Sequence, residues 1–517
     1  MGEKRIIVIG GGVGGLAAAL DLAGRGLDVT LCERALTPGG KMRQVTPSGS
    51  ASSNPIDAGP TVFTMRWVFD ELFESLGERL EDHLTLHPAK TLARHAWVDG
   101  AGGGCLDLFA DIERSVDAIG DFAGAREARG YRRFCDDSRE IFETLEQSFI
   151  RAAEPSMAGL IRGAGVGGLG RLGRMRPFTT MWRALGRYFH DPRLQQLFAR
   201  YATYCGASPF AAPATLMLVA HVEQAGVWYI DGGMHKLAQV LAARIEAKGG
   251  TIRYNAPVAE ILSDAGRVSG VRLADGEHLP ADAVIANSDC AALATGLFGQ
   301  VAQAAVPRPE PAARSLSALT TMVEAKTDGF DLVRHNVFFS SDYRGEFERI
   351  LEHGQLPDEP TIYICAQDRG DVDDPVPDGP ERLLLLVNAP ANGDAGGPSD
   401  KEIQRCEATT HALLRRCGLT IQTQGAPTVQ AGPAAFEALF PASGGALYGR
   451  ASHGWQASFQ RPGVRTKLPG LYLAGGSVHP GPGVPMAALS GRLAAGCLVT
   501  DLSLIAQPRR AATSGGT

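Results

Sequence analysis

Residues 5–15 have the sequence RIIVIGGGVGG. The first part, residues 5–9, is apolar and rich in β-branched side chains, which is typical of a buried parallel strand. Residues 16–23 (LAAALDLA) favour a helix, and residues 27–32 form a second apolar run that ends at Glu33. The segment therefore predicts a strand, a tight glycine turn, a helix and a second parallel strand, which together make one βαβ unit.

The glycines of this turn have the GxGxxG spacing of a dinucleotide-binding site. Gly10 permits the tight turn, Gly12 lets backbone N–H groups approach a pyrophosphate, and Gly15 lets the helix pack closely against the strand. The positive end of the helix dipole then faces the phosphates. Glu33 can accept hydrogen bonds from both ribose hydroxyls, which favours FAD or NAD over NADP. A structural βαβ unit without a ligand is the alternative, but strand, helix, second strand and acid all agree with the binding motif.

Length and composition exclude several classes of protein. With 517 residues the chain can bury a large core and form more than one lobe. The net charge of −6 gives no global nucleic-acid signature. The nine cysteines include no CxxC and no regular spacing, so they predict reduced, buried thiols rather than disulfides or a metal site. We find no run of about twenty apolar residues and predict no membrane span.

The region from Arg151 to His190 has an unusual composition. Seven arginines stand between Arg151 and Arg187 against one acid, Glu154, with large apolar side chains between them. This pattern is typical of a segment that lies on an anionic membrane surface. An ordinary solvated helix pair, whose arginines pair with acids elsewhere, explains it equally well. A second GxGxxG at residues 163–168 is interpreted as a glycine-rich loop, because no β-branched strand precedes it and no acid follows closely.

Eight further motifs extend over most of the chain. They are residues 38–41 (PGGK), 57–60 (DAGP), 61–67 (TVFTMRW), 92–97 (LARHAW), 228–234 (WYIDGGM), 335–344 (HNVFFSSDYR), 364–369 (ICAQDR) and 479–485 (HPGPGVP). Together with the first glycine turn, they resemble the flavin-dependent amine-oxidase-type oxidoreductases over nearly the whole chain. Within that group the sequence is similar to the bacterial carotenoid (phytoene) desaturases, and most of all to the 1-hydroxycarotenoid 3,4-desaturases of purple photosynthetic bacteria.

The resemblance implies FAD as the cofactor and assigns contacts to it. It places Gly10, Gly12 and Gly15 around the pyrophosphate, Glu33 on the ribose, Gly40 and Lys41 along the phosphates, Asp57, Gly59 and Pro60 near the flavin, the Val258 backbone at the adenine, and Gly475, Gly476, Gly483, Val484 and Pro485 on the isoalloxazine side. One position departs from the wider superfamily, in which an acid after the glycine of the last strand often holds the ribityl chain. Here that position is Gly476, followed by Ser477.

The resemblance also implies an α/β fold, in which a Rossmann-type FAD-binding domain is interleaved with an α+β substrate domain. The predicted FAD-binding domain comprises residues 1–80, 222–298 and 425–506, and the substrate and membrane-facing domain comprises residues 81–221 and 299–424. Residues 507–517 are expected to be a disordered tail. The implied location is the cytoplasmic side of the inner or intracytoplasmic membrane, with peripheral attachment.

Desaturation of a polyene needs few polar catalytic groups. An apolar tunnel that excludes water and holds the target carbon at about 3–3.5 Å from flavin N5 does most of the work. Candidates for a proton acceptor or hydroxyl anchor are His95, His235, His335 and, in the loop near the flavin, His479. Each has the alternative of a packed structural histidine. Asp57 could instead cap a turn.

The predicted reaction is FAD-dependent desaturation at C3–C4 of an acyclic 1-hydroxy or 1-methoxy carotenoid. The alternatives are a phytoene desaturase, an FAD-dependent carotenoid isomerase without net redox change, an amine oxidase with a cysteine-linked flavin, and a non-catalytic flavoprotein that carries carotenoids. Because the sequence has no second Rossmann fingerprint, we expect electrons to leave to oxygen or to a quinone rather than to a bound nicotinamide.

Overall fold

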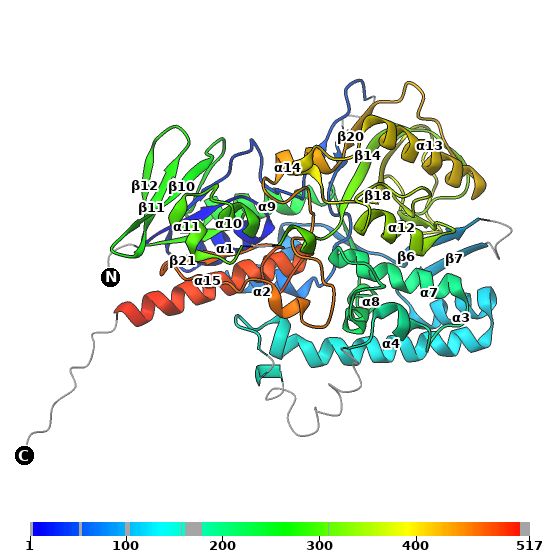
Figure 1. The fold of residues 1–517 in the computed structure, drawn as a ribbon, viewed down its shortest axis with the longest axis horizontal. Helices are drawn as coiled ribbons and strands as arrows, with labels where there is room; N and C mark the ends of the chain where they lie inside the picture. Colours follow the sequence, from blue (N-terminus) through cyan, green and yellow to red (C-terminus); the bar gives the residue numbers. More distant parts are fainter. Residues whose placement is uncertain are drawn as a thin grey trace, which may run out of the picture.

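A parallel sheet assembled from distant parts of the chain organises one lobe of the molecule (Figure 1). The computed structural model describes residues 4–50, 54–98, 104–156, 158–160, 178–308 and 310–506. The strand order is β21-β13-β1-β2-β9, and every neighbouring pair is parallel. The strands are β1 (Arg5–Ile9), β2 (Asp28–Cys32), β9 (Thr251–Arg253), β13 (Ala283–Ala286) and β21 (Leu471–Leu473). The predicted Rossmann-type α/β fold is confirmed.

Helix α1 (Val13–Gly24) is the centre of this lobe. It contacts β1, β2 and β13 and lies between α9 (His235–Ala247) and α15 (Val484–Ala506), as Figure 1 shows for the long C-terminal helix. Helices α1 and α15 approach each other closely where both have a glycine. A Cβ on Gly491 of α15 would lie well under 3.0 Å from the Gly14 carbonyl oxygen of α1. Helix α1 is therefore buried along nearly its whole length, which explains its almost uniformly apolar sequence.

A seven-stranded mixed sheet organises the other lobe. Its order is β20-β14-β18-β17-β16-β6-β7, and all pairs are antiparallel except β16 with β6. The strands are β6 (Thr91–Trp97), β7 (Gly104–Phe109), β14 (Ser317–Ala325), β16 (His335–Phe338), β17 (Ile362–Ala366), β18 (Glu381–Ala389) and β20 (Thr428–Ala431). The two faces differ, because side chains alternate along each strand. In β18, Leu383 and Leu385 pack with residues of α13 (Asp400–Arg416), whereas Leu384 and Leu386 line the main cavity.

Helices form a layer beside this sheet (Figure 1). They include α3 (Ile112–Ala123), α4 (Ala125–Leu145), α6 (Met181–Leu185), α7 (Pro192–Ala199) and α8 (Leu218–Gln224). The sequence predicts a long helical region over residues 111–153 with interruptions near Gly120 and Gly124. The chain breaks at Gly124, where φ is +94°, while Gly120 lies inside α3.

Shorter elements complete the fold. They are α2 (Trp67–Glu74), α10 (Cys290–Ala294), α11 (Gln300–Ala305), α12 (Tyr343–Leu351) and α14 (Pro433–Leu439), and the strand pairs β3 (Gln44–Val45) with β4 (Ile56–Asp57), β5 (Leu86–Pro88) with β8 (Trp228–Ile230) and β15 (Thr327–Gly329) with β19 (Leu419–Ile421). Helix α2 is shorter than the predicted span of residues 67–80, because the chain turns at Gly77 with φ +72°.

The sequence also predicts a hairpin-like meander over residues 268–285, and this prediction is correct only in its first part. Strands β10 (Val258–Asp264), β11 (Arg267–Leu273) and β12 (His278–Pro280) form a three-stranded antiparallel sheet. The chain then leaves this sheet, and β13 enters the parallel sheet between β1 and β21. Pro280 lacks an N–H for further pairing, and the four apolar residues of β13 suit a strand that is buried on both faces.

Three predictions about segments have different outcomes. The division into an FAD-binding and a substrate domain stays a prediction. Strand β20, which lies in the predicted FAD-binding segment 425–506, pairs with β14 of the large sheet. The second GxGxxG at residues 163–168 and the tail at residues 507–517 lie outside the described residues. In the part of the chain that the structure describes, no helix is both long and apolar enough to span a membrane.

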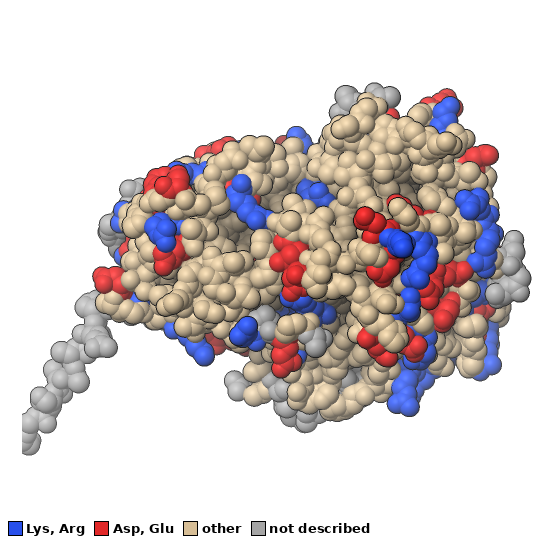
Figure 2. Space-filling model, turned by 45° about the horizontal axis from the view of Figure 1, so that its top comes forward, with Lys and Arg blue, Asp and Glu red and all other residues tan. Residues whose placement is uncertain are grey.

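Charged side chains of both signs are interspersed on the face drawn in Figure 2. Arg151, at the start of the basic region, donates to Glu71 and Glu146, and its guanidinium carbon lies 3.7 Å from the centre of the Trp67 ring. This arginine therefore follows the ion-paired alternative. Residues 161–177, which contain four of the seven arginines of the basic region, lie outside the described residues. All nine cysteines are free thiols, but Cys105 is exposed, so the expected burial does not hold for every one of them.

Candidate active site

One cavity of about 1250 Å³ extends from the glycine turns of the parallel sheet to the large sheet. This volume exceeds the roughly 300–1,000 Å³ of ordinary ligand pockets. Of the fifteen residues predicted to bind the cofactor, thirteen line it: Gly10, Gly12, Glu33, Gly40, Lys41, Gly59, Pro60, Val258, Gly475, Gly476, Gly483, Val484 and Pro485. Gly15 and Asp57 are not part of the lining. The sequence motifs, which span 475 positions, thus meet at one cavity.

The glycine turn has the shape that a pyrophosphate needs. No side chain caps the first turn of α1, whose N-cap is Gly12. A Cβ on Gly12 would lie 2.9 Å from Asn287 Nδ2, so a larger residue here would displace the Asn287 side chain. Gly15 has the packing role expected of the third glycine, because a Cβ there would collide with the Gly10 carbonyl oxygen.

Hydrogen bonds from the backbone fix the orientation of the Glu33 side chain. Its Oε2 accepts from the Gly11 N–H at 2.6 Å and its Oε1 accepts from the Ala35 N–H at 2.7 Å. The side chain is buried and lines the cavity near Ala256 and Val258. Carboxylate oxygens have further lone pairs, so these two bonds leave acceptor capacity for ribose hydroxyls.

A second glycine turn packs on the first and brings Lys41 to the cavity. The Gly39 N–H donates to the Gly11 carbonyl at 2.8 Å. Lys41 Nζ donates to the Leu447 carbonyl at 2.6 Å and lies 5.1 Å from the centre of the Phe440 ring. Burial lowers the pKa of Lys41, and nearby Asp289 opposes this effect. A lysine in this position can neutralise an anion in the cavity.

The Asp57 carboxylate acts on the protein backbone instead of facing the cavity. Its Oδ2 accepts from the Met234 N–H at 2.7 Å and its Oδ1 accepts from the His235 N–H at 3.4 Å. Burial raises the pKa of Asp57, and these bonds oppose the rise. This placement follows the turn-capping alternative, and of the three residues predicted near the flavin only Gly59 and Pro60 line the cavity.

The two predicted catalytic histidines lie behind the cavity wall. His95 is fully buried, its Nδ1 is hydrogen-bonded to the Leu106 carbonyl at 3.2 Å, and its ring stacks on Phe339. His479 Nε2 is hydrogen-bonded to the Phe149 carbonyl at 2.9 Å. Burial lowers the pKa of His95 well below its usual value and the pKa of His479 to about 4. Both therefore have the properties of neutral packed histidines.

The other two histidines also have structural partners. His235 Nδ1 is hydrogen-bonded to the Met42 carbonyl at 2.7 Å. His335 Nδ1 is hydrogen-bonded to Tyr363 OH at 2.7 Å, and burial lowers the pKa of His335 to about 3. Tyr363 is the member of this pair that lines the cavity.

Sequence reasoning missed three polar residues of the wall. Asn287, Arg461 and Arg200 all line the cavity. Asn287 Nδ2 donates to the Gly10 carbonyl at 3.1 Å, and Arg461 donates to the carbonyls of Tyr448 and Gly476. Asn287 follows the carboxyl end of a parallel strand, where ligands of such sheets bind, so assigning β13 correctly would have found it. Arg461 and Arg200 belong to no motif.

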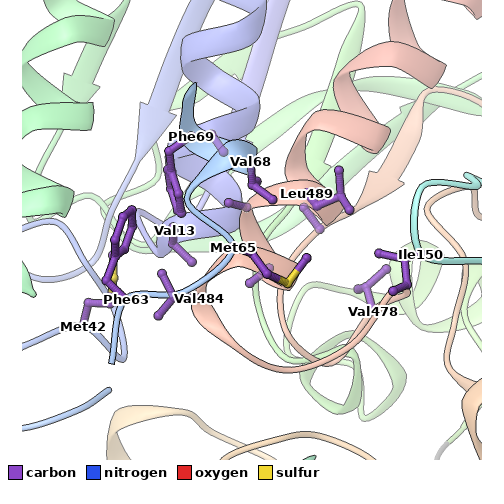
Figure 3. Packing of buried hydrophobic residues seen from close by; sticks show 14 of the residues in the cluster. Val13, Met42, Phe63, Met65, Val68, Phe69, Ile150, Val478, Val484 and Leu489 are labelled. Carbon is purple, nitrogen blue, oxygen red and sulfur yellow. The ribbon is translucent and has the colours of Figure 1, made fainter. Parts of the chain in front are cut away.

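Beyond the glycine turns the cavity wall is largely apolar. Val13, Met65 and Val484 belong both to the buried core and to this wall, and Figure 3 shows their side chains converging with those of Phe63 and Phe69. Further wall residues are Leu145, Ile150, Leu216, Val219, Leu384 and Leu386. A dinucleotide site that continues into an apolar tunnel suits redox chemistry on a long hydrocarbon.

Fold and site together define an FAD-dependent oxidoreductase of the Rossmann type. Residues 13–499 match the family described as flavin containing amine oxidoreductase, and the chain belongs to this family. The chain is 54% identical to a hydroxyneurosporene desaturase of Rubrivivax gelatinosus over 99% of its own length and 96% of that protein. It is 29% identical to a 1-hydroxycarotenoid 3,4-desaturase of Flavobacterium sp., over 95% of its length and 98% of that protein. The fold is similar to that of cyclohexylamine oxidase from Brevibacterium oxydans, with a TM-score of 0.56, 17% identity and coverage of 97% and 100%.

Proposed function

We propose that the protein desaturates an acyclic carotenoid with a hydroxyl or methoxy group at C1, and that the new double bond forms between C3 and C4. The observation that carries this proposal is the single cavity, which joins a glycine-built dinucleotide site to an apolar wall. The similarity to the two desaturases supports the substrate class. FAD, when bound, supplies the acceptor for the hydride that leaves the substrate.

The chain's own residues have three tasks in this reaction. The two glycine turns and Glu33 bind and orient the cofactor. The apolar wall excludes water and holds the polyene in line with the flavin. Thr61 and Tyr363 line the cavity and share a hydrogen bond of 2.7 Å between their oxygens, so their hydroxyls can relay a proton from one to the other.

Parallel assays with purified protein, FAD and lipid vesicles test the proposal. With 1-hydroxyneurosporene and rhodopin we expect the absorbance to shift to longer wavelength as the conjugated system lengthens. Phytoene should give no shift. A shift with phytoene alone would support a phytoene desaturase. If none of the substrates bleaches the bound flavin, the result would support a non-catalytic carrier. Cys497 is buried and is not part of the cavity lining, so the structure does not favour an amine oxidase with a cysteine-linked flavin.

The electron acceptor proposed for the reduced flavin is oxygen or a quinone. This follows from the lack of a second glycine turn with the strand and acid that a nicotinamide site requires. Anaerobic turnover with an added quinone and no NAD(P) should form product. Product formation that depends strictly on NAD(P) would contradict it.

The membrane contact proposed for this chain lies at an exposed aromatic pair. Phe178 is 77% exposed and Trp455 is 39% exposed, their ring centres are 5.3 Å apart, and both line the cavity. Aromatic side chains at a cavity opening can enter the lipid interface, where the carotenoid is dissolved. This placement supports the proposal of peripheral attachment to the inner or intracytoplasmic membrane.

Changing both aromatic residues to serine should weaken binding to anionic vesicles by about tenfold or more, since each buried aromatic contributes roughly 1.5–3 kcal/mol. Flotation with vesicles of phosphatidylglycerol and phosphatidylethanolamine measures the bound fraction. Leu36→Ser is the control, because Leu36 is 75% exposed and is not part of the cavity lining. Equal binding of wild type and the Phe178→Ser/Trp455→Ser variant would refute the proposed contact.

A further inference from the structure

A buried polar cluster interrupts the apolar wall of the cavity. It consists of Arg200 and Tyr204 from η3 (Arg200–Cys205) and Glu223 from α8, and all three line the cavity. Arg200 is only 7% exposed and Glu223 only 5%. Arg200 Nη1 donates to Tyr204 OH at 3.1 Å, and Tyr204 OH donates to Glu223 Oε2 at 2.9 Å. On the other side of the carboxylate, Tyr201 OH donates to Oε1 at 2.6 Å.

The guanidinium of Arg200 has more donors than partners. Its Nε and Nη2 are shielded from solvent and have no hydrogen-bond partner among the residues that the structure describes. An unpaired buried donor costs about 1–3 kcal/mol, and more when it is charged. The Tyr201 and Tyr204 rings hold the guanidinium in place, with its carbon 5.6 and 5.2 Å from their centres. A guanidinium in a cavity wall that has unpaired N–H donors is suited to bind a hydrogen-bond acceptor of a ligand.

The charges of the cluster indicate that this acceptor is neutral. Glu223 lies close enough to Arg200 to interact with it electrostatically and is linked to it through Tyr204. The positive charge of Arg200 is therefore already balanced by a carboxylate. A ligand that brought a second negative charge would meet Glu223 in a medium of low dielectric constant. An ether or alcohol oxygen needs only one N–H donor, which Arg200 provides.

The cluster lines the same cavity as Gly59 and Pro60. Thr61 follows them directly, and its hydroxyl is hydrogen-bonded to that of Tyr363. Tyr363 and Tyr204 both line the cavity, and Tyr204 contributes electrostatically to the pKa of Tyr363, which burial raises well above its usual value. In the proposed reaction the oxygen on C1 is separated from the C3–C4 pair by only one carbon, C2. Any group that anchors that oxygen has to lie in the same cavity as the predicted flavin site, and this cluster lines that cavity.

We propose that Arg200 and Tyr204 bind the C1 oxygen of the substrate and make the enzyme specific for chain ends that carry a tertiary hydroxyl or methoxy group. This inference rests on the proposed function. An Arg200 N–H donates to the oxygen, and a substrate hydroxyl can in turn donate to Tyr204. A chain end without oxygen leaves the donors of Arg200 unpaired, and such a site rejects the analogue that lacks the group.

The Arg200→Met variant tests this with two polyenes, 1-hydroxyneurosporene and neurosporene, of which the second has no hydroxyl. A lost hydrogen bond to a charged group is worth about 1.5–3 kcal/mol, so kcat/KM for the hydroxylated polyene should fall by roughly 10- to 150-fold. With neurosporene, kcat/KM should stay the same or rise. Arg200→Lys should restore part of the preference, because it keeps a charged donor. Equal losses on both polyenes, or none on either, would overturn the inference.

Two tyrosine variants form a matched pair. Tyr204→Phe and Tyr201→Phe each remove one hydrogen bond to Glu223, but only Tyr204 is hydrogen-bonded to Arg200 and lines the cavity. The preference for the hydroxylated polyene should fall in Tyr204→Phe and persist in Tyr201→Phe. The flavin absorbance of each purified variant reports whether it has folded and bound FAD.

A binding measurement separates this inference from the proposed function. Quenching of tryptophan fluorescence in the anaerobic holoenzyme gives the affinity for each polyene without turnover. Wild type that binds the two polyenes equally would overturn the role of Arg200, even if it desaturates both. Wild type that prefers the hydroxylated polyene through Arg200, but does not desaturate it, would contradict the proposed function alone.

Discussion

Replacing Gly15 with alanine is expected to give a colourless protein, with FAD bound at least about a hundredfold more weakly than by wild type. A Cβ at this position would lie well under 3.0 Å from the Gly10 carbonyl oxygen. The Cβ is attached directly to the backbone of α1, and the carbonyl oxygen is part of the backbone after β1. Neither atom can move alone, so α1 would have to move away from the end of β1. Such overpacking costs about 1–3 kcal/mol or more. The movement also displaces the N–H groups of the first helical turn that are predicted to face the phosphates.

The ratio of flavin to protein absorbance after purification, followed by titration of the apoprotein with FAD, measures this effect. Gly496→Ala is the matched control, because it makes the same chemical change in α15 where a new Cβ has open space. It should keep the wild-type flavin content, and alanine inside a helix should stabilise the protein by about 0.5–1 kcal/mol. Wild-type flavin content in Gly15→Ala would contradict the packing role of Gly15.

The sequence predicted the parallel sheet because its signals are local. In β1 and α1, apolar pattern, glycine spacing and helix propensity all belong to one run of about twenty residues. The order of the large sheet has no such local signal. Strand β6 pairs in parallel with β16, although the paired residues are more than 200 positions apart in the sequence. Nothing in the sequence of either strand indicates which strand it pairs with. The error at β13 has the same origin, since four apolar residues can join either of two nearby sheets.

The candidate site divides in a similar way. Glycines that form turns are recognisable from their spacing, and thirteen predicted residues line the cavity. Motif membership places a residue near the site but does not say where its side chain points. The Asp57 carboxylate faces the backbone of Met234, and His479 faces the Phe149 carbonyl. Arg200 belongs to no motif, and only folding brings it to Glu223 and to the cavity.

Replacing Glu346 with glutamine is expected to remove a large pH dependence of stability. Glu346, in α12, is buried, and its carboxylate accepts from the Thr361 N–H at 3.1 Å and from Asn388 Nδ2 at 3.1 Å. Burial raises its pKa from 4.5 to about 7, and these hydrogen bonds only partly oppose the rise. The folded state therefore holds the proton more tightly than the unfolded chain. Its contribution to stability is complete below pH 4.5 and is lost as the pH rises through about 7.

Urea unfolding at pH 4, 5, 6, 7 and 8 measures the difference. We compare the free energy of unfolding of the wild type with that of the Glu346→Gln variant. The wild-type value minus the variant value should be about 3 kcal/mol lower above pH 7 than below pH 4.5. Nearby Tyr343 and Cys406 do not produce this slope, because burial raises the pKa of Tyr343 well above 10 and that of Cys406 to about 12. Glu348→Gln, on an exposed position of the same helix, should keep the wild-type slope. Parallel pH profiles for wild type and Glu346→Gln would show that the buried carboxyl is not protonated in the folded protein.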